Sequence, residues 1–186
     1  ITEDCLLNPP SPYAVGKVSS EYFCKIFHNF GLPTTCFRLF NIYGPGQDMH
    51  YIVQGMVRIF MSFVAKGEPI LVRGSPERFR DFVSVHDVVE AFLLAVDEKA
   101  YGGIYNISTG RRTDVRELLD LIIDAFGYDP KDYPVVYGEP TTNDQFGAYG
   151  DSRRIREDLA WIPKVGLEEG IKEMAKWAKK NVQEIQ

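Results

Sequence analysis

The chain has 186 residues, and its 21 Lys and Arg against 26 Asp and Glu give a formal net charge of −5. This acidic balance argues against a dedicated nucleic-acid binder, which needs a basic face to contact phosphates. No apolar run approaches the roughly 18 residues of a transmembrane helix, and residues 1–5 lack the basic and apolar stretches of a signal peptide, so we expect neither nucleic acid nor a membrane as a partner.

The first half of the chain alternates helical and extended patterns. Ser11 is a candidate N-cap, Pro12 is favourable as a first helical residue, and Gly31 marks the end of this helix. The β-branched and aromatic residues that follow are typical of a strand. The elements predicted here are a loop over 1–12, a helix over 12–30, a strand over 34–40, a turn-rich loop over 41–47, a helix over 53–66 and a strand over 69–72.

The second half continues this alternation. The segment from Ser84 to Asp87 resembles a capping box with Asp in its fourth position, and Thr113 is a candidate N-cap. Apolar residues at helical spacing predict that the last helix packs on the core. The elements predicted here are an extended piece over 82–83, a helix over 88–96, a strand over 104–107, a helix over 115–126, a long loop over 127–151 and a helix from 167 to about 182.

The cysteines and histidines do not form a recognisable metal or disulfide pattern. Cys5, Cys24 and Cys36 are odd in number and contain no C-x-x-C pair, and the three histidines are scattered. We therefore expect no metal site, and buried or half-buried thiols in a protein of the reducing cytoplasm.

Tyr13 and Lys17 form a Y-x-x-x-K pair inside the first predicted helix. At this spacing their side chains share one face, one turn apart. A cation beside a phenol favours the phenolate, and a tyrosine tuned in this way is able to act as general base on a sugar or alcohol hydroxyl. Ala14 and Gly16 leave room for a flat cofactor. The alternative is an ordinary surface pair, because such spacing is common by chance.

Five sequence segments, the first of which contains this pair, are distributed over nearly the whole chain. They are Ser11–Lys17 with Glu21, Arg38–Gln47, Arg80–Val89, Tyr105–Gly110 and Leu159–Lys164. In this order the chain resembles the extended short-chain dehydrogenase/reductase family, and most closely its nucleotide-sugar epimerase and dehydratase branch. The resemblance implies an α/β fold: the C-terminal part of an NAD(P)-binding Rossmann-type enzyme, together with its mixed α/β substrate-binding region.

The resemblance also implies roles for residues around the cofactor. Tyr13 would be the catalytic base, and Lys17 its partner, which also binds the nicotinamide ribose of NAD. Leu39 and Phe40 would lie at the nicotinamide, largely through their backbone.

Two further residues match the family's contacts with the substrate phosphates. Asn41 would bind the substrate near its phosphates, since an amide supplies both a donor and an acceptor. Arg80 would bind the diphosphate, for which a guanidinium fork is suited. The alternatives are a turn-forming Asn at the strand end and an ion pair of Arg80 with Asp81.

The last loop departs from the family pattern. Asp144 matches the family's acid, but Thr141 stands where the family often has a phosphate-binding arginine. This departure leaves the second phosphate contact and the identity of the nucleotide open. Gln54, expected to face the diphosphate, and Arg73, expected to approach the base, are the candidates to compensate.

The family's glycine-rich nucleotide loop and its catalytic Ser or Thr are absent from this sequence. Pro45 prevents Gly44 and Gly46 from presenting successive amides to a phosphate. We therefore expect the C-terminal half of such an enzyme, inactive alone, without the N-terminal nucleotide-binding half. Residues 1–47 would belong to the Rossmann-type core, and residues 48–186 mostly to the substrate-binding region, with short returns to the core sheet.

The resemblance predicts that the intact enzyme epimerises C4 of a nucleotide sugar, as a UDP-sugar 4-epimerase does, with NAD as cofactor. One alternative is a nucleotide-sugar 4,6-dehydratase, and another is a non-catalytic substrate-binding or dimerisation fragment. The first helix carries more large apolar residues than one narrow stripe can bury, including Tyr22, Phe23 and Ile26. We therefore expect a homodimer through this helix, as in the family.

Overall fold

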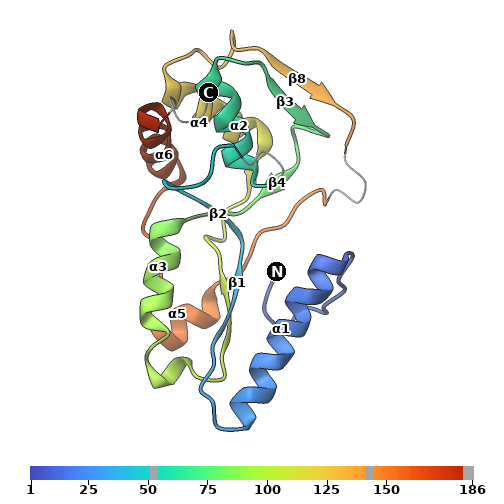
Figure 1. Ribbon diagram of the computed structural model, residues 1–186, viewed down its shortest axis with the longest axis vertical. Helices are drawn as coiled ribbons and strands as arrows, with labels where there is room; N and C mark the ends of the chain where they lie inside the picture. The colour runs from blue at the N-terminus through green and yellow to red at the C-terminus, as the bar shows by residue number, and fades with distance from the viewer. Residues whose placement is uncertain (51–53, 141–144, 182–186) are drawn as a thin grey trace.

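The buried side chains form two hydrophobic clusters. Figure 1 shows the helices and strands around them as an upper and a lower lobe, joined through the middle of the molecule. The computed structural model describes residues 1–50, 54–140 and 145–181. Its architecture is mixed α/β, as the sequence predicts.

The lower lobe is built on a two-stranded parallel sheet. Strand β1 (Cys36–Leu39) pairs with β6 (Ile104–Ile107). Helix α1 (Pro12–Asn29) lies on one side of β1, and α3 (Val85–Leu94) and α5 (Arg153–Leu159) lie on the other (Figure 1). The short 3-10 helix η1 (Glu98–Ala100) precedes β6. Most buried side chains of this lobe come from α3, α5, β6 and the segment after α5, where Trp161 is buried, and η1 adds Ala100.

The upper lobe packs three helices against a second parallel pair of strands. Its helices are α2 (Met56–Lys66), α4 (Val115–Phe126) and α6 (Leu167–Asn181). Strand β3 (Ile70–Arg73) pairs with β8 (Val135–Gly138). The apolar faces of the three helices supply most of this cluster.

The two lobes meet where one extended segment changes partner. β1 leads directly into β2 (Asn41–Tyr43), which pairs in parallel with β5 (Phe82–Ser84) instead of β6. The change falls at Phe40, whose amide donates to Ile107, while the next amide, of Asn41, donates to Asp81. An antiparallel pair, β4 (Phe79–Arg80) with β7 (Thr113–Asp114), lies beside this junction.

Local sequence signals account for most of the helices. The Ser11 hydroxyl accepts a hydrogen bond from the Ala14 amide at 3.2 Å, which confirms the predicted cap of α1. Gly67 and Gly127 end α2 and α4 in the left-handed conformation, which glycine adopts without a steric penalty. The predicted bounds of β6 and α4 are confirmed.

Four predictions are wrong, and each error involves a contact between distant parts of the chain. The loop predicted over 41–47 contains β2, and the loop predicted over 127–151 contains β8, because strands elsewhere pair with both. Thr113 lies in β7 and does not cap α4. Ser84 caps α3 by accepting from the His86 amide, while the Asp87 carboxylate accepts from Lys164 and Val165 rather than completing a capping box.

Candidate functional site

A cavity of about 350 Å³ opens at the carboxyl end of β1, where the extended segment changes partner. In open α/β sheets, such an end is where ligands bind. We call it the site cavity. Four of the residues that sequence predicts for cofactor or substrate line it together, namely Leu39, Phe40, Asn41 and Arg80. The rest of its lining is Ile1, Cys5, Leu7, Arg38, Asn106, Gln145 and Ala148.

Asn41 and Arg80, both predicted to contact the substrate phosphates, donate hydrogen bonds to backbone carbonyls. The Asn41 side-chain Nδ2 donates to the Asp81 carbonyl at 3.0 Å. The Arg80 guanidinium donates to the carbonyls of Phe79, Phe146 and Gln145, the last at 2.7 Å. These bonds fix the two groups at the same wall, and a ligand phosphate would have to replace the carbonyls around Arg80.

Asp81 organises this wall, although sequence reasoning considered it only as an ion-pair partner for Arg80. It is 0% exposed. Its Oδ1 accepts from the Thr109 amide and hydroxyl at 2.9 and 2.6 Å, and its Oδ2 accepts from the amides of Gly110 and Gly150 at 2.9 and 3.1 Å. The carboxylate therefore joins the end of β6 to the segment before α5. Because Asp81 follows Glu77, Arg78 and Arg80 closely, the local sequence gives no signal that this carboxyl is buried.

The predicted pair on α1 has the expected geometry. The Lys17 Nζ lies 5.3 Å from the centre of the Tyr13 ring, within the range of a cation–π contact. Tyr13 is 68% exposed, so its hydroxyl is open to a ligand. Neither residue is among those that line the site cavity.

An ion pair sets the position of α1 along β1. The Arg38 Nε and Nη2 donate to both carboxylate oxygens of Glu21 at 2.9 and 2.7 Å, and Nη1 donates to the Glu3 carbonyl. The hydrogen bond with Glu21 is the main reason that the pKa of Arg38 is raised. Lys17 shares the Glu21 face of the helix, one turn toward its N-terminus.

This ion pair brings the Tyr13 face of α1 toward the site cavity. One helical turn advances about 5.4 Å, and two strand residues advance about 6.6 Å. Since the helix and the strand run in opposite directions (Figure 1), this spacing would bring Lys17 level with Phe40, two residues beyond Arg38. Tyr13 is one turn further in the same direction.

The remaining predicted site residues lie apart from this cavity or outside the described residues. Gln54 is exposed before α2, where its carbonyl accepts from the Arg58 guanidinium. Arg73 is exposed at the end of β3, and its carbonyl accepts from the Arg78 guanidinium. Asp144 falls outside the described residues, although the following Gln145 lines the site cavity.

Two negative findings concern the described residues only. They hold no group of three or more His, Cys, Asp or Glu side chains that could bind a metal ion. Likewise, no helix within them combines the length and the apolar character needed to cross a membrane.

Comparison with known proteins gives consistent matches. A family model described as GDP-mannose 4,6 dehydratase matches residues 1–174. The UDP-glucose 4-epimerase of Mycolicibacterium smegmatis is 37% identical over 173 residues, which make up 91% of this chain and 53% of the relative. The chain spans about half the length of the curated relatives it matches.

Solved structures agree with these sequence matches. UDP-glucose 4-epimerase from Thermotoga maritima, with UDP-glucose, matches at a TM-score of 0.92 and 38% identity, over 98% of this chain and 58% of that chain. The Thermus thermophilus UDP-glucose 4-epimerase, in complex with NAD, matches at a TM-score of 0.81 and 32% identity, over 92% of this chain and 55% of that chain. The predicted match to the C-terminal part of such a fold is confirmed.

Proposed function

Because this chain belongs to the GDP-mannose 4,6-dehydratase family, among the extended short-chain dehydrogenases/reductases that act on nucleotide sugars, we propose that the whole protein is an NAD-dependent nucleotide-sugar 4-epimerase. The observation that carries this proposal is the gathering of Leu39, Phe40, Asn41 and Arg80 at one cavity. The epimerase relatives and structures favour epimerisation over dehydration.

The residues present fit the nicotinamide end of NAD. Lys17 and Tyr13 are exposed one turn apart on α1, so an ammonium and a hydroxyl are available to a ribose. Leu39 is 43% exposed at the end of β1 and offers an apolar surface for a flat ring. When bound, NAD supplies hydride acceptance and return at the sugar carbon.

The remaining chemistry belongs to this chain's own side chains. The Tyr13 hydroxyl, as phenolate, takes the proton from the 4-hydroxyl of the sugar, and the nearby Lys17 ammonium stabilises the phenolate charge. The Asn41 amide and the Arg80 guanidinium bind the diphosphate and so hold the sugar in position. Gln54, Arg73 and Asp144 are further proposed contacts with the substrate.

The proposal extends to the organisation and assembly of the protein. Residues 1–47 would belong to the Rossmann-type core, and residues 48–186 mostly to the substrate-binding region with short returns to the core sheet, of which β6, paired with β1, would be one. We place the protein in the cytoplasm, and the free state of Cys5, Cys24 and Cys36 supports this.

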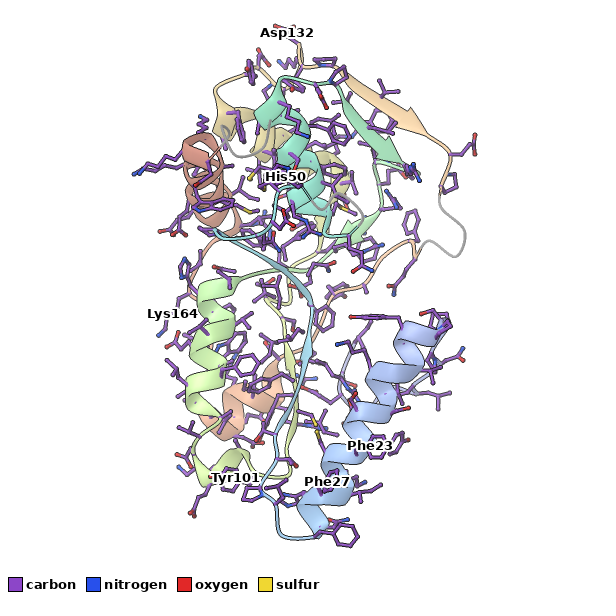
Figure 2. The ribbon with its side chains drawn as sticks, viewed as in Figure 1. Phe23, Phe27, His50, Tyr101, Asp132 and Lys164 are labelled. Atoms are coloured by element: carbon purple, nitrogen blue, oxygen red, sulfur yellow. The ribbon has the colours of Figure 1, made fainter. Side chains whose placement is uncertain are left out.

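A homodimer through α1 is also proposed. The helix has no buried residue, and Phe23 and Phe27 are 59% and 50% exposed. Figure 2 shows both on a helix at the margin of the molecule, beyond which no other helix or strand lies. Isologous pairing of two such helices would bury these side chains.

The test is product analysis with the full-length protein. Incubation with UDP-glucose should yield UDP-galactose, separated by chromatography, whereas the dehydratase alternative yields a 4-keto-6-deoxy sugar. UDP-, dTDP- and GDP-sugars are compared in parallel, because Thr141 leaves the nucleotide open. Absence of both products with every donor would refute the catalytic proposal and favour the binding or dimerisation fragment.

A further inference from the structure

Two of the three cysteines lie between α1 and β1, and neither has a role in the function proposed above. Cys24 lies on α1 and Cys36 begins β1. Both are half-buried, whereas Cys5 is exposed. The sequence predicts buried or half-buried thiols, which is confirmed for Cys24 and Cys36 and wrong for Cys5.

The contact between the two thiols follows from how α1 lies along β1. Glu21 and Cys24 are three residues apart on one face of the helix, and Arg38 and Cys36 are two residues apart on one face of the strand. Since Glu21 pairs with Arg38 and the two elements run in opposite directions, Cys24 comes level with Cys36.

A hydrogen bond between α1 and the residues before β1 lies on the other side of the two thiols. The Thr34 hydroxyl donates to the Cys24 carbonyl at 2.9 Å. The thiols therefore lie between two ties that hold the helix on the strand. Burial, then the side-chain hydrogen bond with Cys24, raise the pKa of the Cys36 thiol to about 12, which agrees with the position of the two thiols between these ties.

From this geometry we propose that Cys24 and Cys36 are a site of reversible disulfide formation, which fastens α1 to β1 when the protein meets a low-molecular-weight disulfide such as oxidised glutathione. The Cys24 sulfur, as thiolate, attacks one sulfur of the glutathione disulfide and expels one glutathione thiolate. Cys36 then gives up its proton and attacks the Cys24 sulfur of the mixed disulfide, releasing the second glutathione. The two protein thiols are oxidised, the added disulfide is reduced to two thiols, and the two protons pass to the released glutathiones.

This bond would act on the helix that carries the Y-x-x-x-K pair. It would cross-link the ends of a short loop, residues 25–35, and so restrict the unfolded chain. The thermal midpoint of the oxidised protein should rise by roughly 5 °C, and reduction should reverse the shift.

The test uses the intact protein in a Cys5→Ser background, which removes the exposed thiol. After incubation with oxidised glutathione at low protein concentration, free thiols are alkylated and the digest is mapped by mass spectrometry. We expect a Cys24–Cys36 linked peptide with the mass loss of two hydrogen atoms and without bound glutathione. The matched Cys36→Ser variant should instead retain glutathione on Cys24.

Two results would overturn the proposal. One is alkylation of both thiols after oxidation, and the other is a lasting glutathione adduct on Cys24 while Cys36 is still present. Because the readout is a covalent bond, it is independent of whether the protein epimerises a sugar.

Discussion

Asp81 is a fully buried side chain whose two carboxyl oxygens accept four hydrogen bonds. Three backbone amides and one hydroxyl donate to it, and its own carbonyl accepts from the Asn41 side chain. Buried charges of this kind are tolerated only when such donors are complete. The residue therefore stabilises the wall of the site cavity on which Asn41 and Arg80 lie.

Replacement of Asp81 by Asn should destabilise the protein by on the order of 2–4 kcal/mol, since an amide NH₂ would face buried N–H donors and leave them unsatisfied. Urea unfolding followed by circular dichroism measures this change. The matched Asp124→Asn variant alters an exposed carboxyl on α4 and should stay within about 0.5 kcal/mol of the wild type. Equal stability of the two variants would contradict the anchoring role.

In the proposed function, Tyr13 only takes the proton from the 4-hydroxyl of the sugar, so loss of its hydroxyl should affect turnover more than substrate binding. In the full-length enzyme, Tyr13→Phe should lower kcat by roughly a hundredfold or more and leave KM nearly unchanged. Steady-state kinetics with the accepted nucleotide sugar gives both values. Tyr22→Phe, which removes the hydroxyl of another exposed tyrosine on α1, is the control. Wild-type turnover of Tyr13→Phe across the pH range would make Tyr13 a structural residue.

At the scale of elements, α1 is the least enclosed helix among the described residues. It is tied to β1 by the ion pair between Glu21 and Arg38 and by the bond from Thr34 to Cys24, while its outer side is apolar and exposed. Polar ties fix its position, whereas the large apolar side chains contribute little burial within this chain. In the proposed homodimer, a second copy of the chain would bury these side chains.

A charge on the outer side of α1 should therefore weaken assembly. Phe23→Glu in the full-length protein should convert the dimer to monomer at micromolar concentration, because the carboxylate would lose hydration in the interface. Light scattering coupled to size-exclusion chromatography measures the mass. Ile162→Glu changes an exposed apolar residue away from α1 and should leave the dimer intact. A stable wild-type monomer would rule out the interface.

How far the elements follow from sequence depends on where their partners lie. Pro12 and Ser11 start α1, and Gly127 ends α4, through contacts within a few residues, so these bounds were predictable. β8 and β2 depend on pairing with distant strands, and α5 was not foreseen because its seven residues carry little periodic signal. The same distinction holds at the site, where Arg80 was predicted from its match to the family's motif, whereas the donors around Asp81 come from distant segments.

At the scale of the whole molecule, the described residues would, in the proposed function, hold the nicotinamide end of NAD, but the sequence supplies no cradle for its pyrophosphate. Such a cradle uses consecutive amides at a helix N-terminus that follows glycines. In this sequence, Pro45 interrupts the pair Gly44 and Gly46. Half of a cofactor site gives only a small part of the binding free energy.

Calorimetric titration of the 186-residue chain with NAD should consequently show no sub-micromolar binding. The full-length protein, titrated in the same buffer, is the positive control and should bind tightly. Sub-micromolar affinity of the 186-residue chain itself would mean that it contains a pyrophosphate site that its sequence does not reveal.

The extended segment over residues 36–43 belongs to both lobes, because β1 pairs with β6 and its continuation β2 pairs with β5. Its Phe40 packs against the lower cluster, and its Tyr43 is buried in the upper one. Domain closure ordinarily uses loop residues that absorb large backbone rotations, whereas here a hydrogen-bonded strand crosses the boundary beside the cavity. The floor of the site cavity is therefore stiff, and a change in its shape would come from the carbonyl-bound Arg80 and the segment that holds it rather than from a rotation of one lobe relative to the other.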